Sequence, residues 1–443
     1  MNAKPVQGVQ REQSEQRATG RGAAEALDEA ILVLNCGSSS IKFALFDAAA
    51  KPLPRTPLWS GQIEGINTSN PRLLVAHEAP VALSLEGERP YHAALQSVRT
   101  CVERRTGGRL PAAVAHRVVH GGGKYAAPVR VGREVLAELK SYIPLAPLHQ
   151  PFALGAIEVM LDDAPQLPQV ACFDTAFHHT LPEVEQMMAL PYAFWERGIR
   201  RYGFHGLSYE YMALALAERH GDRARGRTIV AHLGSGASLC AMRELKSAAT
   251  TMGFSALDGL MMGTRSGSLD PGVLLHLIDS EKPGKEQLTH LLYHESGLLG
   301  VSGLSSSPLP LLAAEETNPR ARAALDLYVR RIVREIGALT AVLGGLDMLA
   351  FTAGVGEHSA ALRSRICRAL GWLGLDIDED ANRANASIIS RPSSRICVVV
   401  EKTNEEWIAA SHALRVVHAS ATDHALRGLQ AATQPIAIQT AAA

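Results

Sequence analysis

Two kinds of apolar pattern alternate through most of the chain. Short runs of aliphatic and β-branched residues, such as 395–400, alternate with segments in which apolar residues recur at helical spacing, such as 321–343. This alternation is typical of a mixed α/β protein in which helices flank sheets. Residues 1–28 and 421–443 lack such periodicity, so we expect a disordered N-terminal tail and a flexible C-terminal tail.

Two segments about 200 residues apart share one pattern. Residues 33–40 (VLNCGSSS) and 230–237 (VAHLGSGA) each pass from an apolar strand through a polar residue into a Gly/Ser turn. One such turn by itself is more often an ordinary hairpin than a phosphate site. The pair, together with a third Gly-rich turn at 351–357, favours two related halves with a nucleotide between them.

Composition limits the class of partner. Lys plus Arg and Asp plus Glu each number 44, so charge gives no reason to expect a nucleic acid or an anionic membrane as partner. The six cysteines form no C-x-x-C pair, and no apolar run approaches the roughly 18 residues of a membrane helix. We therefore expect a cytoplasmic protein with small-molecule substrates.

A series of motifs, in order along the chain, resembles the acetate kinase family, a branch of the actin-like, sugar kinase and Hsp70 ATPase superfamily. The motifs lie at 35–43, 116–122, 146–149, 173–178, 202–206, 259–271, 354–357 and 403–406. The resemblance implies a two-lobed actin-like (ribonuclease H-like) ATPase fold, with duplicated βββαβαβα-type domains and the nucleotide in the interlobe cleft. It implies a first lobe formed by 29–175 and completed by a last helix within 404–420, and a second lobe formed by 176–403.

The activity implied by this resemblance is reversible phosphoryl transfer between ATP and acetate, giving ADP and acetyl phosphate. A carboxylate is already a nucleophile, so such a reaction needs charge neutralisation and alignment more than a general base. The implied cofactor is Mg²⁺, with Mn²⁺ as a substitute, and the implied assembly is a homodimer. Two alternatives stay open: a propionate or butyrate kinase of the same family, and a non-catalytic actin-like nucleotide-binding protein.

Three residues receive catalytic roles from the resemblance. Asp174 would orient the reactants electrostatically, and His205 and Arg265 would stabilise the phosphoryl group in transit. From the residues alone, Asp174 could equally be a helix N-cap, and His205 could be a packed core histidine. A planar guanidinium and an apolar pocket would bind the carboxylate substrate; these residues are Arg117, Val119, Leu148, Phe204 and Ala256.

By the same resemblance, ATP and the metal ion would bind at the three Gly-rich turns and at the start of the last helix. The implied nucleotide contacts are Lys42, His232, Leu233, Gly234, Ser235, Gly236, Ser307, Gly354, Val355, Gly356, Glu357 and His358. The implied Mg²⁺ ligands, both with the oxygen atoms that this ion prefers, are Asn35 and Glu405. Glu405 could alternatively be only an acidic residue in the first turn of a helix.

Several positions depart from the family pattern. Ser235 and His358 each replace an Asn, and Ser307 replaces an Asp, so the fit of the nucleotide is open. Ala256 replaces a common proline, which should enlarge the acyl pocket and favour propionate several-fold. Three further positions carry Gly, Gln and Tyr where Glu, Asn and His are usual: Gly123, Gln150 and Tyr209.

Overall fold

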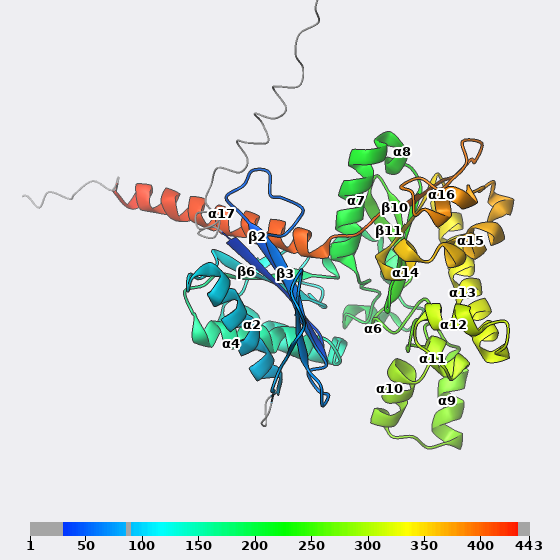
Figure 1. The fold of residues 1–443 in the computed structure, drawn as a ribbon, viewed down its shortest axis with the longest axis horizontal. Helices are drawn as coiled ribbons and strands as arrows, with labels where there is room; N and C mark the ends of the chain where they lie inside the picture. Colours follow the sequence, from blue (N-terminus) through cyan, green and yellow to red (C-terminus); the bar gives the residue numbers. More distant parts are fainter. Residues whose placement is uncertain (1–29, 86–89, 433–443) are drawn as a thin grey trace, which may run out of the picture.

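The chain folds around two β-sheets that lie side by side in the computed structural model, which describes residues 30–85 and 90–432 (Figure 1). The first sheet has the strand order β5-β4-β3-β2-β1-β6-β8-β7. Its strands are β1 (Ala30–Cys36), β2 (Ser40–Asp47), β3 (Trp59–Glu64), β4 (Arg72–Val75), β5 (Val81–Ala82), β6 (Ala113–Val118), β7 (Val129–Arg130) and β8 (Gln169–Phe173).

The second sheet is smaller, with the order β11-β10-β9-β12-β13. Its strands are β9 (Thr228–Leu233), β10 (Ala237–Arg243), β11 (Lys246–Thr250), β12 (Met348–Thr352) and β13 (Cys397–Val400). Every position of these strands is buried except Arg243, Lys246, Ala248 and Val400. Their residues are therefore apolar in continuous runs, as expected for strands covered on both faces.

The two sheets repeat one topology. In the first, β1 pairs antiparallel with β2 and β2 with β3, while β6 and β8 extend the sheet in parallel. In the second, β9, β10 and β11 are antiparallel in the same way, and β12 and β13 are parallel. Both predicted Gly/Ser turns join the first two strands of their sheet. The duplicated two-lobed actin-like fold predicted from the sequence is thus confirmed.

Helices cover both faces of the first sheet (Figure 1). On one face, α2 (Pro90–Thr106) and α4 (Gln150–Asp163) bury the side chains of Leu32, Leu34 and Phe43. The opposite face is covered by α17 (Glu405–Ala432), which packs on β1, β6 and β8 although it is the last helix of the chain. This helix continues through 421–432, which the sequence predicts as the start of a tail. The predicted tail 1–28 and residues 433–443 lie outside the described residues.

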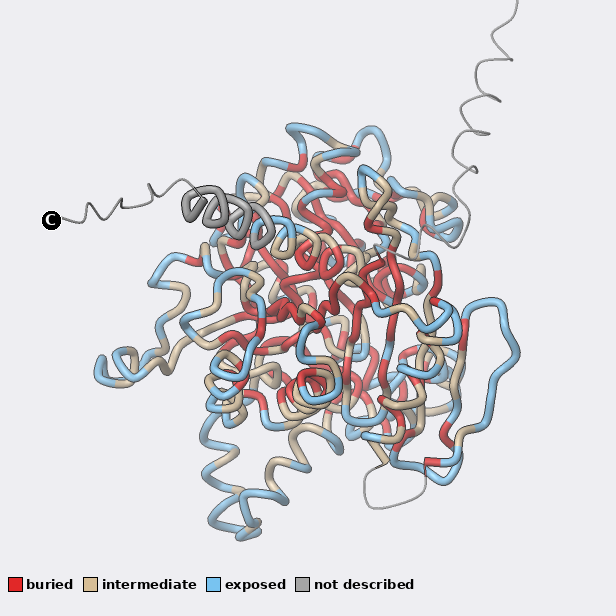
Figure 2. Tube along the Cα trace, turned by 90° about the vertical axis from the view of Figure 1, so that its left-hand side faces the viewer, coloured by how far each residue is buried: buried red, intermediate tan, exposed pale blue. Residues whose placement is uncertain are grey.

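One apolar core joins the two halves. It contains Ile31 and Val33 of β1, Val230 of β9, and residues of α7 (Gly206–His220) and α17 such as Met212 and Ile408. Figure 2 shows the buried chain gathered at the centre of the molecule. Because both helices contribute to this shared core, the halves are held together by burial rather than by a single linker.

The other face of the second sheet carries the long helix α13 (Pro319–Leu343), close to the helical span predicted for 321–343. Its N-terminus is capped by the Asn318 side chain, which accepts from the backbone N–H groups of Arg320 and Ala321. The remaining helices are α3 (Arg133–Ser141), α5 (Glu183–Gln186), α6 (Tyr192–Glu196), α8 (Asp222–Arg225), α9 (Pro271–Ser280), α10 (Lys285–His294), α11 (Gly297–Ser302), α12 (Pro308–Ala314), α14 (Ala353–His358), α15 (Ala360–Ala369) and α16 (Glu379–Arg383). None of the helices in the described part of the chain has the length and apolar character needed to span a membrane.

Candidate active site

A cleft of about 470 Å³ lies between the two sheets, where the carboxyl ends of their parallel strands face each other. In open α/β sheets, ligands bind at such strand ends. Most of the site residues expected from the sequence line this cleft: Asn35, Lys42, Arg117, Val119, Asp174, Phe204, His205, His232, Gly234, Ser235, Gly236, Ala256, Arg265, Gly354, Glu357 and Glu405.

Arg117 and Asp174 form the best-defined contact of the cleft. Arg117 lies near the end of β6, and Asp174 directly follows the neighbouring strand β8. The Arg117 Nη2 atom donates to Asp174 Oδ2 at 2.7 Å, and Nε donates to Oδ1 at 2.9 Å. This two-pronged geometry fixes both side chains. Asp174 is therefore an ion-pair partner and not a helix N-cap, since the following 3₁₀ turn (Ala176–Thr180) has Thr175 at that position.

The third nitrogen of Arg117 faces two more oxygen groups. Its Nη1 lies 3.5 Å from Asn35 Oδ1 and 3.6 Å from Glu405 Oε2. Burial lowers the pKa of this guanidinium, but the carboxylates of Asp174 and Glu405 outweigh burial, so its pKa is raised above the usual value. Burial also raises the pKa of Glu405 to about 7, against the opposing effect of Arg117. Arg117 is thus a permanent cation surrounded by oxygen atoms.

Asn35 and Glu405 are the cleft residues whose oxygen atoms could hold a magnesium ion. Their oxygens converge on one nitrogen of Arg117, one from the end of β1 and one from the start of α17. Within residues 30–85 and 90–432, no group of three or more His, Cys, Asp or Glu side chains is arranged to hold a metal ion. Mg²⁺ keeps several waters and binds through one or two protein groups plus phosphate oxygens, so this sparse oxygen pair suits it.

Two histidines form the opposite wall of the cleft. The rings of His205 and His232 stack with centroids 4.2 Å apart and an interplanar angle of 18°. His205 precedes α7 with φ of 60°, a left-handed conformation that is uncommon for a residue other than glycine. Each ring is held through Nδ1, which lies 2.8 Å from Ser238 Oγ in His205 and 2.9 Å from Ser208 Oγ in His232.

Both histidines are neutral at neutral pH. Burial lowers the pKa of His232 to about 3, helped by the charge of Arg117. Burial, together with His232 and the cations Arg117 and Arg265, lowers the pKa of His205 well below its usual value. Two stacked rings between two guanidinium groups cannot both carry a positive charge, because like charges at such short range repel. This wall can therefore donate or accept hydrogen bonds without adding charge.

Arg265 adds a second guanidinium to the cleft, on the side of His205. Its Nη1 donates to the backbone carbonyl of Ala256 at 3.0 Å, and its Nη2 lies 3.3 Å from His149 Nε2. Burial lowers the pKa of His149 to about 4, with further effects from Arg265 and Arg117. A neutral His149 can accept a hydrogen bond from Arg265, so it orients that guanidinium.

The turn between β9 and β10 lies against these cations. A Cβ added at Gly236 would lie 3.3 Å from His205 Nε2 and 3.6 Å from Arg265 Nη1. Only a residue without a side chain leaves this space open for a ligand. The turn is closed by a hydrogen bond from the Gly234 N–H to the Gly236 carbonyl at 3.1 Å.

The third Gly-rich segment forms the short helix α14 rather than a simple turn. Its first residue, Ala353, has φ of 64°, so the chain enters the helix through a strained left-handed residue. The Glu357 carboxylate accepts from the Ala353 N–H at 2.9 Å and from the Thr403 N–H at 3.3 Å. These contacts fix the segment against the approach to α17.

Some expected contacts lie away from the cleft. Leu233 is buried in the core, and Val355 packs against that core. Gly356 lies against the backbone of Ala231, and the His358 side chain is 76% exposed. Ser307 is exposed before α12, and Leu148 is half-buried beside His149. The roles suggested for these six residues stay predictions.

Five cleft residues were not assigned roles from the sequence: His149, Ala353, Lys402, Thr403 and Glu406. Four of them lie next to an assigned residue or within its motif, and Lys402 directly precedes the motif 403–406. Their position beside predicted site residues could therefore have indicated that they lie near the cleft. It could not show which neighbour points into the cleft, because that depends on local backbone direction.

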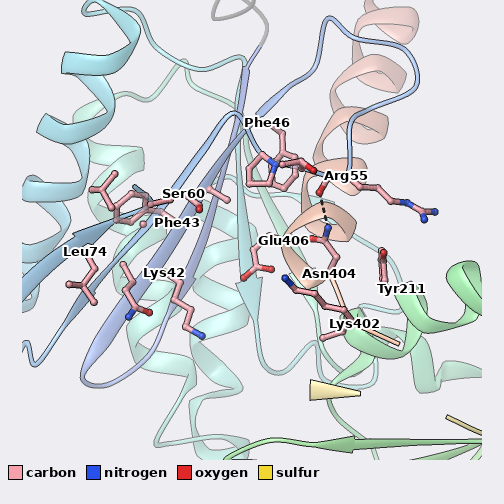
Figure 3. A pocket seen from close by; sticks show the side chains of 18 of the residues that line it. Lys42, Phe43, Phe46, Arg55, Ser60, Leu74, Tyr211, Lys402, Asn404 and Glu406 are labelled. Atoms are coloured by element: carbon pink, nitrogen blue, oxygen red, sulfur yellow. Dashed lines mark hydrogen bonds between the residues drawn. The ribbon is translucent and has the colours of Figure 1, made fainter. Parts of the chain in front are cut away.

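A second hollow of about 900 Å³ adjoins the cleft and shares Lys42, Lys402, Thr403 and Glu406 with it. Figure 3 shows Lys42 of β2 and Lys402 on two sides of this hollow, with Glu406 between them. Its other cations are already paired: Arg55 binds Glu218 at 2.6 Å, and Arg219 binds Glu401. Lys42 and Lys402 are exposed, lie at the junction of the two spaces, and have no ion-pair partner among residues 30–85 and 90–432.

Comparison with known proteins agrees with this geometry. The sequence matches the Acetokinase family over residues 30–411. The acetate kinase of Rhodopseudomonas palustris (strain ATCC BAA-98 / CGA009) is 46% identical over 395 residues, which cover 88% of this chain and 99% of that protein. The acetate kinase of Methylocella silvestris is 45% identical over 404 residues, covering 88% and 98%.

Solved structures give the same result. The acetate kinase of Porphyromonas gingivalis superposes with a TM-score of 0.78 at 36% identity, covering 88% of this chain and 100% of that one. A propionate kinase from Francisella tularensis subsp. tularensis SCHU S4 superposes with a TM-score of 0.79 at 34% identity, covering 87% and 98%. The fold, the cleft and the sequence therefore agree that this chain belongs to the acetokinase family.

Proposed function

We propose that the protein is an acetate kinase that transfers a phosphoryl group reversibly between ATP and acetate. The observation that carries this proposal is one cleft with an Arg117–Asp174 fork on one wall and His205 with Arg265 on the other. A carboxylate acceptor and a phosphoryl group both carry negative charge, and the two half-buried guanidiniums of Arg117 and Arg265 can hold them at reacting distance.

Each side chain of the cleft has a distinct role in this proposal. Asp174 holds Nε and Nη2 of Arg117, and Nη1, whose contacts with Asn35 and Glu405 are long at 3.5 and 3.6 Å, binds the carboxylate. Val119, Phe204 and Ala256 surround the acyl group. Arg265 and His205 donate hydrogen bonds to the phosphoryl oxygens, where charge is spread in the transition state. Asp174 fixes Arg117 and needs to remove no proton, because acetate is ionised at neutral pH.

The metal ion in this proposal is Mg²⁺, held by Asn35 and Glu405 together with phosphate oxygens. When bound, it neutralises charge on the phosphates of ATP. Lys42 and the β9–β10 turn contact the phosphates, and Gly354 and Glu357 lie on the nucleotide side of the cleft. ATP and ADP are the co-substrates.

The direct test is formation of acetyl phosphate from ATP and acetate, trapped as the hydroxamate. We expect activity in the wild type, dependence on Mg²⁺, and a loss of at least about 100-fold in Asp174→Asn. Asp222→Asn, at the exposed start of α8, is the matched control and should retain activity. An inactive wild type, or equal rates in the wild type and Asp174→Asn, would reject the proposal.

Propionate is the second candidate substrate, favoured by one observation. Ala256 lines the cleft, where its small side chain leaves room beside Val119 and Phe204. One additional buried methylene is worth about 0.8 kcal/mol. The kcat/KM of propionate relative to acetate should therefore be several-fold higher than in an enzyme with proline at this position. The kcat/KM ratio of propionate to acetate should fall in Ala256→Pro, and an unchanged ratio would contradict the pocket argument.

We further propose a homodimer in which α9 contributes to the contact. Its apolar side chains are exposed: Leu275 by 64%, and Val273 and Ile278 by 45% each. Three exposed large aliphatic side chains on one short helix are more than single scattered residues, and such patches mark interaction surfaces. Light scattering should give twice the mass of the chain, and Leu275→Asp should shift it to one chain. A wild-type monomer would contradict this assembly.

A further inference from the structure

A buried chain of hydrogen bonds leads to the ring of His205. The Tyr209 hydroxyl lies 2.5 Å from Ser238 Oγ, and the same Oγ lies 2.8 Å from His205 Nδ1. Tyr209 stands one turn after His205 on α7, and Ser238 lies on β10 of the second sheet. Tyr209 and Ser238 are completely buried. The two hydroxyl groups therefore have no access to water and must satisfy each other and the ring.

Counting protons fixes the direction of these bonds. Each hydroxyl has one proton to donate, and in the described part of the chain Ser238 Oγ is the single partner of the Tyr209 hydroxyl. Tyr209 must therefore donate to Ser238, which leaves Ser238 to donate its own proton to His205 Nδ1. The reverse order would leave the Tyr209 proton buried without an acceptor, which costs about 1 to 3 kcal/mol. Nδ1 is thus the acceptor.

The other ring nitrogen then carries the proton. Nε2 of His205 faces the β9–β10 turn, where a Cβ on Gly236 would lie 3.3 Å from it and 3.6 Å from Arg265 Nη1. No hydrogen-bond partner for Nε2 is present among residues 30–85 and 90–432. The N–H therefore points into the cleft beside a guanidinium.

We propose that Tyr209 is a positioning residue which, through Ser238, holds His205 as the neutral tautomer protonated on Nε2. This inference rests on the proposed phosphoryl transfer for its catalytic meaning. Phosphoryl oxygens only accept hydrogen bonds, so an Nε2–H stabilises them, whereas a bare Nε2 lone pair would repel them. Burial raises the pKa of Tyr209 well above its usual value, so this phenol stays protonated and remains a donor.

The proposal explains why a tyrosine is useful at position 209. A phenol has one donor proton and an aromatic body that fills apolar space. The ring of Tyr209 packs edge-on against His178, with centroids 5.6 Å apart, and beside Phe177. These contacts fix the direction of the hydroxyl, so the tautomer does not depend on a mobile group.

The test combines the tautomer with kinetics. In ¹⁵N-histidine-labelled protein, long-range ¹H–¹⁵N correlation spectra separate protonated from unprotonated ring nitrogens, and His205→Gln identifies the signal. We expect Nε2–H in the wild type and a mixture of tautomers in Tyr209→Phe. That variant should lose about 3- to 10-fold in kcat, with the KM for ATP and acetate nearly unchanged. The reason is that the substitution lowers only the fraction of enzyme molecules in which His205 carries its proton on Nε2.

Tyr328→Phe is the matched control. Tyr328 is also fully buried, but its hydroxyl has no hydrogen-bond partner in the described structure, so its loss should change neither tautomer nor kcat. In Ser238→Ala, adding Tyr209→Phe should have no further effect, because both act through one chain of bonds.

Three outcomes would overturn the inference. They are Nδ1–H in the wild type, an unchanged tautomer in Tyr209→Phe, and additive effects of Tyr209→Phe and Ser238→Ala. An inactive wild type with Nε2–H intact would support the tautomer while rejecting acetate kinase activity, so the two proposals fail separately.

Discussion

The two halves of the molecule bring different side chains to the cleft at the ends of their central strands. In the first half, Asn35 and Arg117 lie at the ends of paired strands β1 and β6, and Asp174 follows β8. At the corresponding places of the second half are His232, Thr352 and Glu401. The first set is built around an ion pair of 2.7 Å within the cleft, whereas the second contributes a neutral stacked histidine to the cleft and its Glu401 pairs with Arg219 in the adjoining hollow.

This difference shows how a duplicated fold makes an asymmetric site. The same strand order places both sets at facing sheet edges. In the proposed reaction the two sets have different tasks: Arg117, Asn35 and Glu405 bind the carboxylate and the metal ion, while the neutral histidines donate hydrogen bonds without adding positive charge. The repeated strand order therefore sets where these side chains lie, and the difference in their chemistry makes the site asymmetric.

The largest effect is expected from breaking the charged wall. Arg117→Ala should lower kcat/KM by about 10³-fold, or about 4 kcal/mol, since it removes the carboxylate contact. It also leaves Asp174, 3% exposed, without its partner, so the free energy of unfolding should fall by about 3 kcal/mol. Urea titration and steady-state kinetics measure the two effects. Arg133→Ala, whose side chain is 65% exposed, should change neither; a fully active Arg117→Ala would contradict the charged-wall assignment.

The neutral wall should give a smaller loss. His205→Ala should lower kcat by about 100-fold, because one hydrogen-bond donor to the transition state is lost. Stability should change less than in Arg117→Ala, since no charge is left unpaired. His290→Ala, with a side chain 61% exposed, is the control and should keep the wild-type rate. Equal rates for His205→Ala and the wild type would mean that this wall is only structural.

Acidification should weaken both halves through their buried histidines. Burial lowers the pKa of His116 in the first half to about 4 and that of His232 in the second to about 3. Between these values and about 6.5 the unfolded chain binds more protons, so the free energy of unfolding falls as pH falls. Each histidine contributes at most about 1.4 kcal/mol per pH unit. Urea midpoints between pH 7 and pH 5 measure the slope.

Removing one of these histidines should flatten that dependence. His116→Gln should reduce the slope, whereas His290→Gln, at a 61% exposed side chain, should not. A slope that is the same in His116→Gln and the wild type would show that His116 does not titrate in this range.

The smallest effect is expected at a residue outside both walls. Ser307 is exposed and does not line the cleft, so Ser307→Ala should change the KM for ATP by less than about two-fold. A large rise in this KM would mean that the nucleotide extends beyond the cleft to α12. The nucleotide site would then include α12 in addition to the two walls.

The sequence by itself determined the elements and the set of chemical groups. Apolar runs and Gly/Ser turns indicated both hairpins, and helical spacing indicated most of α13. These features depend on residues close together in the chain, where the periodicity of side chains and the turn residues decide the local backbone. The family motifs added the fold, the activity and most of the residues that line the cleft.

Only the tertiary structure decided which groups meet. Asp174 was equally compatible with a helix cap until β6 placed Arg117 beside it. The entry of Lys402 and Thr403 into the cleft depends on the last segment returning to the first sheet. The tautomer of His205 depends on Ser238 of another strand. Such contacts join residues tens to hundreds of positions apart, and sheet order and burial, which no local pattern encodes, bring them together.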